Sequence, residues 1–127
     1  MRRVARRGKE GAIVLTFSRI TPRQVVARTT KGERVAFVDV RADEALSRAG
    51  LRLGGAVRVR PASLVRDATN VPRGCAVVVY GHDERDVDVA RVAEGLRSQG
   101  FREVRVLAGG FSAWVELRYA VETAAAA

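Results

Sequence analysis

The feature that most restricts the fold of this chain is an unbroken apolar run at residues 75–80, with the sequence CAVVVY. An apolar run that is rich in β-branched side chains and has no polar face is typical of a strand buried on both sides. Residues 35–40 form a second, near-continuous apolar run, which includes Asp39. Such strands occur in parallel sheets whose two faces are covered by helices. The two runs therefore predict an α/β fold.

Segments with helical features separate the strand-like runs. Thr21 can cap a helix that starts at Pro22, and Gln24 completes a capping box. A longer helix is predicted over residues 87–98, where apolar residues recur at helical spacing. The other expected elements are strands at 12–17, 56–59 and 103–107, and helices at 42–49, 61–68 and 111–117. This alternation of strands and helices favours a mostly parallel sheet.

The chain has 127 residues, which suits one domain, and a single cysteine, Cys75. One cysteine cannot form an internal disulfide, so we expect a reducing, cytoplasmic location. The apolar stretch at residues 12–17 is too short for the core of a signal peptide, and no run reaches the length of a membrane span. We predict a basic N-terminal arm over residues 1–10, one domain over 12–122 and a disordered tail over 123–127.

The net charge of the chain is +9, carried almost entirely by arginine. A basic chain attracts polyanions, so a protein that binds nucleic acid or a membrane surface through residues 2–9 is one hypothesis. The arginines are spread over every segment, however, whereas a nucleic-acid reader concentrates them on one face or element. We therefore expect neither nucleic acid nor a membrane as the partner.

Several short motifs resemble one known family in their order and spacing. Residues 38–41, with the sequence VDVR, and Glu44 resemble the start of rhodanese-like domains. Residues 52–56 resemble the H-I-P-G-A stretch that follows it, with Gly54 where proline is usual. Residues 100–114 resemble the closing signature G-F…V…L…G-G…A-W. The resemblance extends over residues 20–122.

This resemblance implies a single rhodanese-like domain with a five-stranded, mainly parallel central sheet and helices on both faces. It also implies transfer of a sulfane sulfur through a persulfide on a cysteine directly after the central strand. In this chain that position is Gly81. Cys75 precedes it by six residues, which at ~3.3 Å per residue places it on the order of 20 Å away, at the opposite end of the strand. We expect Cys75 to be a small buried hydrophobic residue.

The loop after the central strand is acidic. Its residues are Gly81, His82, Asp83, Glu84, Arg85 and Asp86. A loop that binds an anionic sulfur donor presents backbone N–H groups and a helix N-terminus to it. Asp83 or Asp86 can instead cap the following helix with its own carboxylate and repel an anion. We therefore predict a catalytically inactive domain that acts as a binding or regulatory module, with a protein as its partner.

Other functions use the same residues. The alternative to an inactive module is a sulfurtransferase that works by another route, for example with a cysteine from a partner chain. His82 and its acidic neighbours are metal-ligand types, but their spacing matches no known site, and a solvated helix start also explains them. His82 beside Asp83 can act as a general base, but the loop contains no Ser, Thr or Cys nucleophile. We predict no metal and no cofactor, and the missing thiol also argues against a cysteine-dependent phosphatase.

The resemblance also suggests roles for residues outside the loop. It places Arg41 and Glu44 at the edge of the pocket, and it gives Asp39 a structural role in holding backbone groups near the loop. We expect Trp114 in the core between the last helix and the sheet. The pair Gly109-Gly110 is expected to form a turn that needs positive φ.

Overall fold

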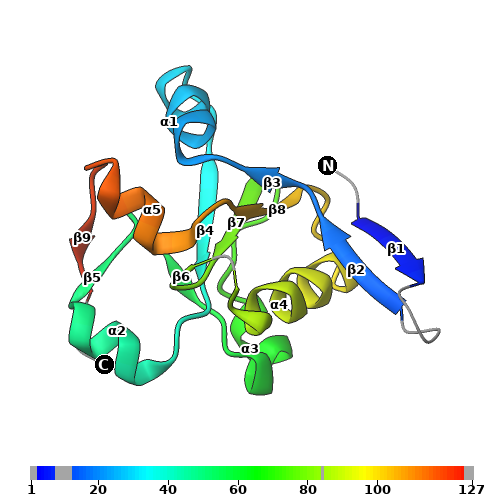
Figure 1. Ribbon diagram of the computed structural model, residues 1–127. Helices are drawn as coiled ribbons and strands as arrows, with labels where there is room; N and C mark the ends of the chain where they lie inside the picture. Colours follow the sequence, from blue (N-terminus) through cyan, green and yellow to red (C-terminus); the bar gives the residue numbers. More distant parts are fainter. Residues whose placement is uncertain (1–2, 8–12, 84, 125–127) are drawn as a thin grey trace.

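The central sheet contains five strands, and all of its pairings are parallel (Figure 1). The computed structural model describes residues 3–7, 13–83 and 85–124. Across the sheet, the strands are β3 (Arg19–Ile20), β8 (Val104–Leu107), β7 (Ala76–Tyr80), β4 (Val35–Asp39) and β6 (Val57–Arg58). The predicted α/β domain is confirmed, and the apolar run that suggested it forms the middle strand.

Helices cover both faces of this sheet. They are α1 (Pro22–Thr30), α2 (Asp43–Ala49), α3 (Leu64–Ala68), α4 (Val87–Ser98) and α5 (Gly110–Glu116). Successive residues of a strand point to opposite faces. On β7, Val78 and Tyr80 therefore pack with residues of α1 and α5, and Val77 and Val79 pack with residues of α3 and α4. All of β7 is buried, which explains why its sequence has no polar face.

The helix starts predicted from capping residues are confirmed. The Thr21 hydroxyl accepts a hydrogen bond from the Gln24 N–H at 3.1 Å, and the Gln24 side chain accepts one from the Thr21 N–H at 2.9 Å. This reciprocal pair satisfies two donors that the first turn of α1 would otherwise leave open. The helix predicted over residues 87–98 is α4. Its buried residues are Val89, Val92, Ala93 and Leu96.

The N-terminal segment forms a separate hairpin. Strand β1 (Arg3–Arg7) pairs antiparallel with β2 (Ile13–Phe17), and β2 contacts α4 and β8. The strand expected at residues 12–17 therefore exists but does not enter the central sheet. The short strand β3 takes the edge position beside β8, and β2 pairs with β1. Residues 1–2 and 8–12, which include part of the expected arm, lie outside the described residues.

A second antiparallel pair joins a strand from the middle of the chain to one near its end. Strand β5 (Leu51–Arg52) pairs antiparallel with β9 (Glu122–Thr123), and the Ala124 N–H donates to the Gly50 carbonyl at 2.9 Å. Thr123 and Ala124, which were expected to belong to a disordered tail, are instead held by β5 and the Gly50 carbonyl. Residues 125–127 lie outside the described residues.

The Glu122 carboxylate on β9 binds donors from β5 and from the turn that follows β5. Glu122 accepts hydrogen bonds from the Gly55 N–H at 2.9 Å and from the Arg52 guanidinium at 2.8 Å. These bonds, that from Gly55 first, hold the pKa of Glu122 below its usual value. Neither β5 nor β9 was predicted, because residues 51–52 (LR) and 122–123 (ET) form no apolar run.

Within the described ranges, no helix combines the length and the apolar character needed to span a bilayer.

A buried carboxylate, Asp67, holds the segment between β6 and α3. Its side chain is 8% exposed and accepts hydrogen bonds from the Arg60 N–H at 3.0 Å and the Ser63 hydroxyl at 3.1 Å. Burial by itself raises the pKa of a carboxyl group. The hydrogen bonds from Arg60, Ser63 and Arg66 outweigh burial and hold the pKa of Asp67 below its usual value.

We predict that Asp67→Asn removes part of the acid sensitivity of the fold. A carboxyl whose pKa is lowered by folding stabilises the native state above the unfolded-state pKa, and this contribution disappears as the pH falls through the folded-state value. The variant is expected to lose about 1–3 kcal/mol of unfolding free energy at neutral pH, with a smaller difference from the wild type near pH ~3. Urea denaturation of the variant and the wild type between pH ~3 and neutral pH measures the difference in unfolding free energy at each pH.

Glu116→Gln is the matched control, because Glu116 is exposed on α5 and the change removes the same charge. Its effect on unfolding should stay within about 0.5 kcal/mol at each pH. A constant difference between Asp67→Asn and the wild type at all pH values would contradict the role given to Asp67.

Candidate functional site

The candidate site lies where the middle strand β7 ends and the loop 81–86 begins. Gly81 is buried, and an ideal Cβ built on it would lie 2.6 Å from Oδ2 of Asp86 and 2.9 Å from its Cβ. Real Cβ atoms do not approach other heavy atoms this closely. The Asp86 side chain therefore occupies the space in which any side chain at residue 81 would begin.

The same carboxylate caps the next helix. Oδ1 of Asp86 accepts a hydrogen bond from the Asp88 N–H at 3.0 Å, and Asp86 is the N-cap residue of α4. A carboxylate in this position satisfies one free N–H and interacts favourably with the helix dipole. Of the two predicted capping candidates, Asp86 fills the role. Asp83 instead accepts the Arg85 N–H at 2.8 Å, within the loop.

Helix α5 holds the loop from the other side. The Phe111 N–H donates to the Gly81 carbonyl at 2.9 Å, and the Ser112 N–H donates to the His82 carbonyl at 3.0 Å. The contact is close: a Cβ on Gly110 would lie 2.8 Å from the Gly81 carbonyl oxygen. The positive φ predicted for the glycine pair is confirmed, at 74° for Gly109 and 60° for Gly110. A glycine is therefore required at residue 110 by both backbone angle and space.

Beneath the loop lies a buried ion pair between Asp39 and Arg41. Their side chains are 2% and 1% exposed, and Nη2 of Arg41 lies 2.7 Å from Oδ2 of Asp39. The Arg41 N–H and the Tyr80 hydroxyl also donate to this carboxylate, at 2.9 Å each. The Tyr80 oxygen in turn accepts the Leu53 N–H at 3.2 Å. The structure thus places Asp39 where it binds backbone and side-chain donors at the end of β4, next to the last residue of β7.

The aromatic neighbours complete this cluster. The Arg41 guanidinium carbon lies 4.1 Å from the centre of the Phe111 ring, and Nη2 donates to the Leu51 carbonyl at 2.7 Å. Burial, and then the charge of Asp39, raise the pKa of Tyr80, so its hydroxyl stays protonated and donates. Removing one partner of a buried pair like this one leaves an uncompensated charge. Arg41 is thus buried between Asp39, the Leu51 carbonyl and the Phe111 ring, and it does not line the exposed side of the loop.

Three of the remaining predicted site residues, His82, Arg85 and Glu44, are exposed. His82 and Arg85 point to solvent on the loop, and the Arg85 side chain is 92% exposed. Glu44 is exposed on α2, and within the described ranges no hydrogen bond or ion pair joins it to the loop. Glu84 lies outside the described residues. Among the residues that are described, no three His, Cys, Asp or Glu side chains come together as metal ligands.

The fold of this chain matches known proteins. A family model for the rhodanese-like domain covers residues 21–117. The chain belongs to the rhodanese-like domain family. No curated protein sequence is similar enough to this rhodanese-like chain to match it.

Solved structures share the rhodanese-like fold. The rhodanese-like domain of the Anabaena protein Alr3790 is 22% identical, with 86% of this chain and 81% of that chain covered and a TM-score of 0.67. A rhodanese-like domain protein from Staphylococcus aureus is 22% identical, with 76% and 90% covered and a TM-score of 0.63. A Rhodopseudomonas palustris protein, described as of unknown function and a possible tyrosine phosphatase, is 21% identical, with 84% and 85% covered and a TM-score of 0.67.

Cys75 lies at the other edge of the rhodanese-like sheet. It directly precedes β7, whereas Gly81 directly follows this strand. The prediction that Cys75 is a buried hydrophobic residue is only partly correct: it packs against the core but is half-buried, and it lines an open groove. Its thiol is 3.8 Å from the Pro72 carbonyl oxygen. Sequence reasoning missed the groove because it forms only when separate strand ends meet.

We predict that Gly81→Ala destabilises the domain by about 1–3 kcal/mol, because the added methyl group collides with Asp86. In an Asp86→Gly background, in which both the carboxylate and its Cβ are absent, Gly81→Ala should cost much less. The free energy of unfolding of the four proteins, measured in urea, gives the coupling between residues 81 and 86.

Gly54→Ala is the control, since a Cβ there meets nothing closer than Oε2 of Glu122 at 3.9 Å. We expect it to change the unfolding free energy by less than about 1 kcal/mol. An equal cost of Gly81→Ala in both backgrounds would show that Asp86 does not fill this space in solution.

Proposed function

We propose that this rhodanese-like domain does not transfer sulfur at loop 81–86 and acts as a binding or regulatory module. One observation carries the proposal: the Asp86 side chain occupies the space in which a side chain at residue 81 would start. The resemblance to the family assigns the nucleophilic cysteine to this position. The chain has glycine there, and its neighbour fills the space that a sulfur atom and its substrate would need.

The charges around the loop support the same proposal. Asp86 already accepts an N–H at the start of α4, where an anionic sulfur donor would be bound. Asp83 lies in the same loop, and its nearest cation, Arg85, is almost fully exposed. An anion such as thiosulfate would therefore meet carboxylates in place of free N–H donors.

The absence of a thiol at residue 81 bears equally on phosphatase chemistry. The Rhodopseudomonas palustris protein is described as a possible tyrosine phosphatase, and a cysteine-dependent phosphatase also needs a thiolate nucleophile. Any sulfur transfer by this chain alone would have to use Cys75, its one cysteine, which lies at the opposite edge of the sheet. Neither activity is favoured by the geometry of the loop.

A thiosulfate assay tests the loss of sulfur transfer. In the family reaction, cyanide accepts the sulfane sulfur of thiosulfate, giving thiocyanate and sulfite. We expect thiocyanate formation by the wild type to equal that of a buffer blank, and Cys75→Ser to be indistinguishable from it. Turnover well above the blank would overturn the proposal, and its loss in Cys75→Ser would identify the thiol responsible.

A variant series separates the missing thiol from the altered surroundings. Gly81→Cys alone should gain little activity, because Asp86 crowds the new thiol, raises its pKa and repels the anionic substrate. Gly81→Cys with Asp86→Gly should form more thiocyanate than Gly81→Cys, since both obstacles are removed. Strong activity from Gly81→Cys alone would show that the acidic loop does not hinder the reaction.

The exposed part of the loop offers a surface for a protein partner. Val87, the first residue of α4, is 70% exposed beside His82 and Arg85. Protein interfaces have an apolar core and a polar rim, and Val87 is the apolar side chain that this surface offers for such a core. We expect Val87→Asp with Arg85→Glu to abolish capture of the partner bound by the wild type. Leu117→Asp with Arg118→Glu, on the exposed end of α5, should retain it, and equal loss in both variants would place the interface elsewhere.

A further inference from the structure

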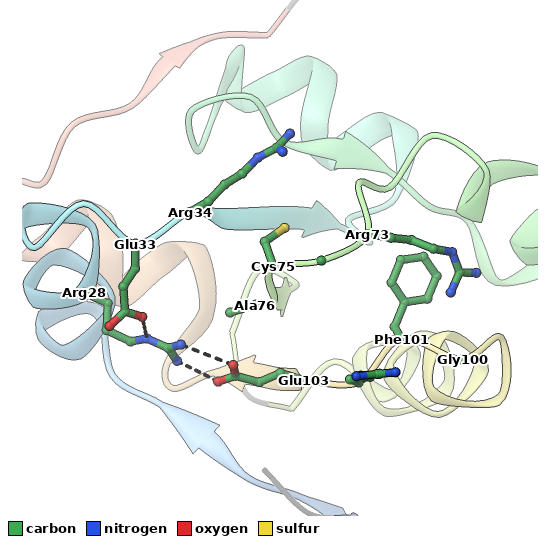
Figure 2. Close-up of a pocket in the computed structure, with 11 residues that line it drawn as sticks. Arg28, Glu33, Arg34, Arg73, Cys75, Ala76, Gly100, Phe101 and Glu103 are labelled. Carbon is green, nitrogen blue, oxygen red and sulfur yellow. Dashed lines mark hydrogen bonds and ion pairs between the residues drawn. The ribbon is translucent and has the colours of Figure 1, made fainter.

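The amino edge of the central sheet, opposite the loop, carries an arginine before each of three adjacent strands. Arg34 precedes β4, Arg73 precedes β7 by a short loop, and Arg102 precedes β8. These strands are neighbours in the sheet and run parallel, so their first residues meet at one edge. The three arginines line one open groove with a volume of about 760 Å³ (Figure 2).

The two carboxylates of this groove are already neutralised. Arg28 lies 2.6 Å from Glu33 and donates two hydrogen bonds to Glu103, at 2.7 and 3.2 Å. Arg105 lies 3.3 Å from Glu103 as well. The hydrogen bonds from Arg28, more than any other contact, hold the pKa of Glu103 below its usual value. Both acids are therefore paired with Arg28 or Arg105, and they leave the other arginines without a carboxylate partner.

Those other arginines differ in how firmly they are held. Arg73 stacks over the Phe101 ring at 4.1 Å and donates to the Gln99 carbonyl at 2.8 Å, so its guanidinium is fixed in place. Arg34 and Arg102 are exposed, and no hydrogen bond or ion pair joins either one to another described residue. Arg73 donates to Gln99 at the end of α4, so a helix-capping role accounts for its position. No such role accounts for the positions of Arg34 and Arg102. The groove thus contains one positioned and two unpaired cations.

We propose that this groove binds a phosphorylated small molecule through Arg34, Arg73 and Arg102. A guanidinium group matches the oxygens of a phosphate with two parallel N–H donors. The groove volume lies in the range of small-molecule sites and greatly exceeds a single phosphate ion. Ala76 and the buried Phe101 provide apolar lining for the organic part of the ligand. This site is separate from loop 81–86 and does not depend on the function proposed for it.

Cys75 provides a built-in reporter of the groove. In the view of Figure 2, Arg34 and Arg73 lie on either side of its thiol. It is the one cysteine of the chain, so a thiol reagent modifies a single position. The dianionic disulfide DTNB should react with Cys75 faster than the intrinsic reactivity of this thiol predicts, because the groove arginines attract the reagent. Dithiodipyridine is neutral and is not attracted by the arginines. Its rate with Cys75 therefore measures changes in the reactivity of the thiol itself.

The first experiment compares two variants that remove equal charge. Arg34→Gln with Arg102→Gln removes two groove cations, whereas Arg23→Gln with Arg48→Gln removes two exposed cations from α1 and α2. We expect the rate ratio of DTNB to dithiodipyridine to fall about 5-fold in the groove variant and to stay near the wild-type value in the control. Equal ratios in the wild type and both variants would overturn the proposal, as would equal decreases in both variants.

The second experiment measures binding directly with pyrophosphate as the probe. Calorimetry at about 0.15 M salt should show saturable binding to the wild type, weakened at least about tenfold in the groove variant and unchanged in the control. Bound pyrophosphate should also slow the DTNB reaction of Cys75. No saturable heat with the wild type, or equal weakening in both variants, would show that the groove has only the general attraction of a basic protein.

Discussion

All pairings of the central sheet are parallel, and both candidate surfaces of this protein follow from that constraint. A parallel sheet gathers the carboxyl ends of its strands at one edge and the amino ends at the other. Residues that follow β4 and β7 therefore build the loop site, and residues that precede β4, β7 and β8 build the arginine groove. The helices pack on the two faces and leave these edges open for function.

The carboxyl edge is closely packed: a buried ion pair, backbone hydrogen bonds and the Asp86 side chain all meet there. The Asp39–Arg41 pair is buried under Phe111 and is held by the hydroxyl of Tyr80. Above it, the first N–H groups of α5 hold the loop carbonyls. Asp86 then fills the space that Gly81 leaves free. A filled, hydrogen-bonded loop of this kind presents a surface of defined shape. Persulfide chemistry needs instead an accessible sulfur atom and room for an anion.

The amino edge has the opposite character. Its groove is open, carries unpaired arginines and contains the only thiol of the chain. Its acids are paired with Arg28 and Arg105, so the local charge is positive despite their presence. The two proposals together predict that an anion is repelled at the carboxyl edge and attracted at the amino edge. Under these proposals, the two edges of one small sheet serve different partners.

The sequence by itself determined the α/β class, the middle strand, the capping box of α1 and the absence of a cysteine at residue 81, because each depends on neighbouring residues or on a short local pattern. Tertiary structure alone decided three other features. Asp86 turns back over Gly81, the arginines before separate strands line one groove, and the hairpin of β1 and β2 stays outside the central sheet. Each depends on contacts between segments whose relative positions are set by packing, which a local pattern does not encode.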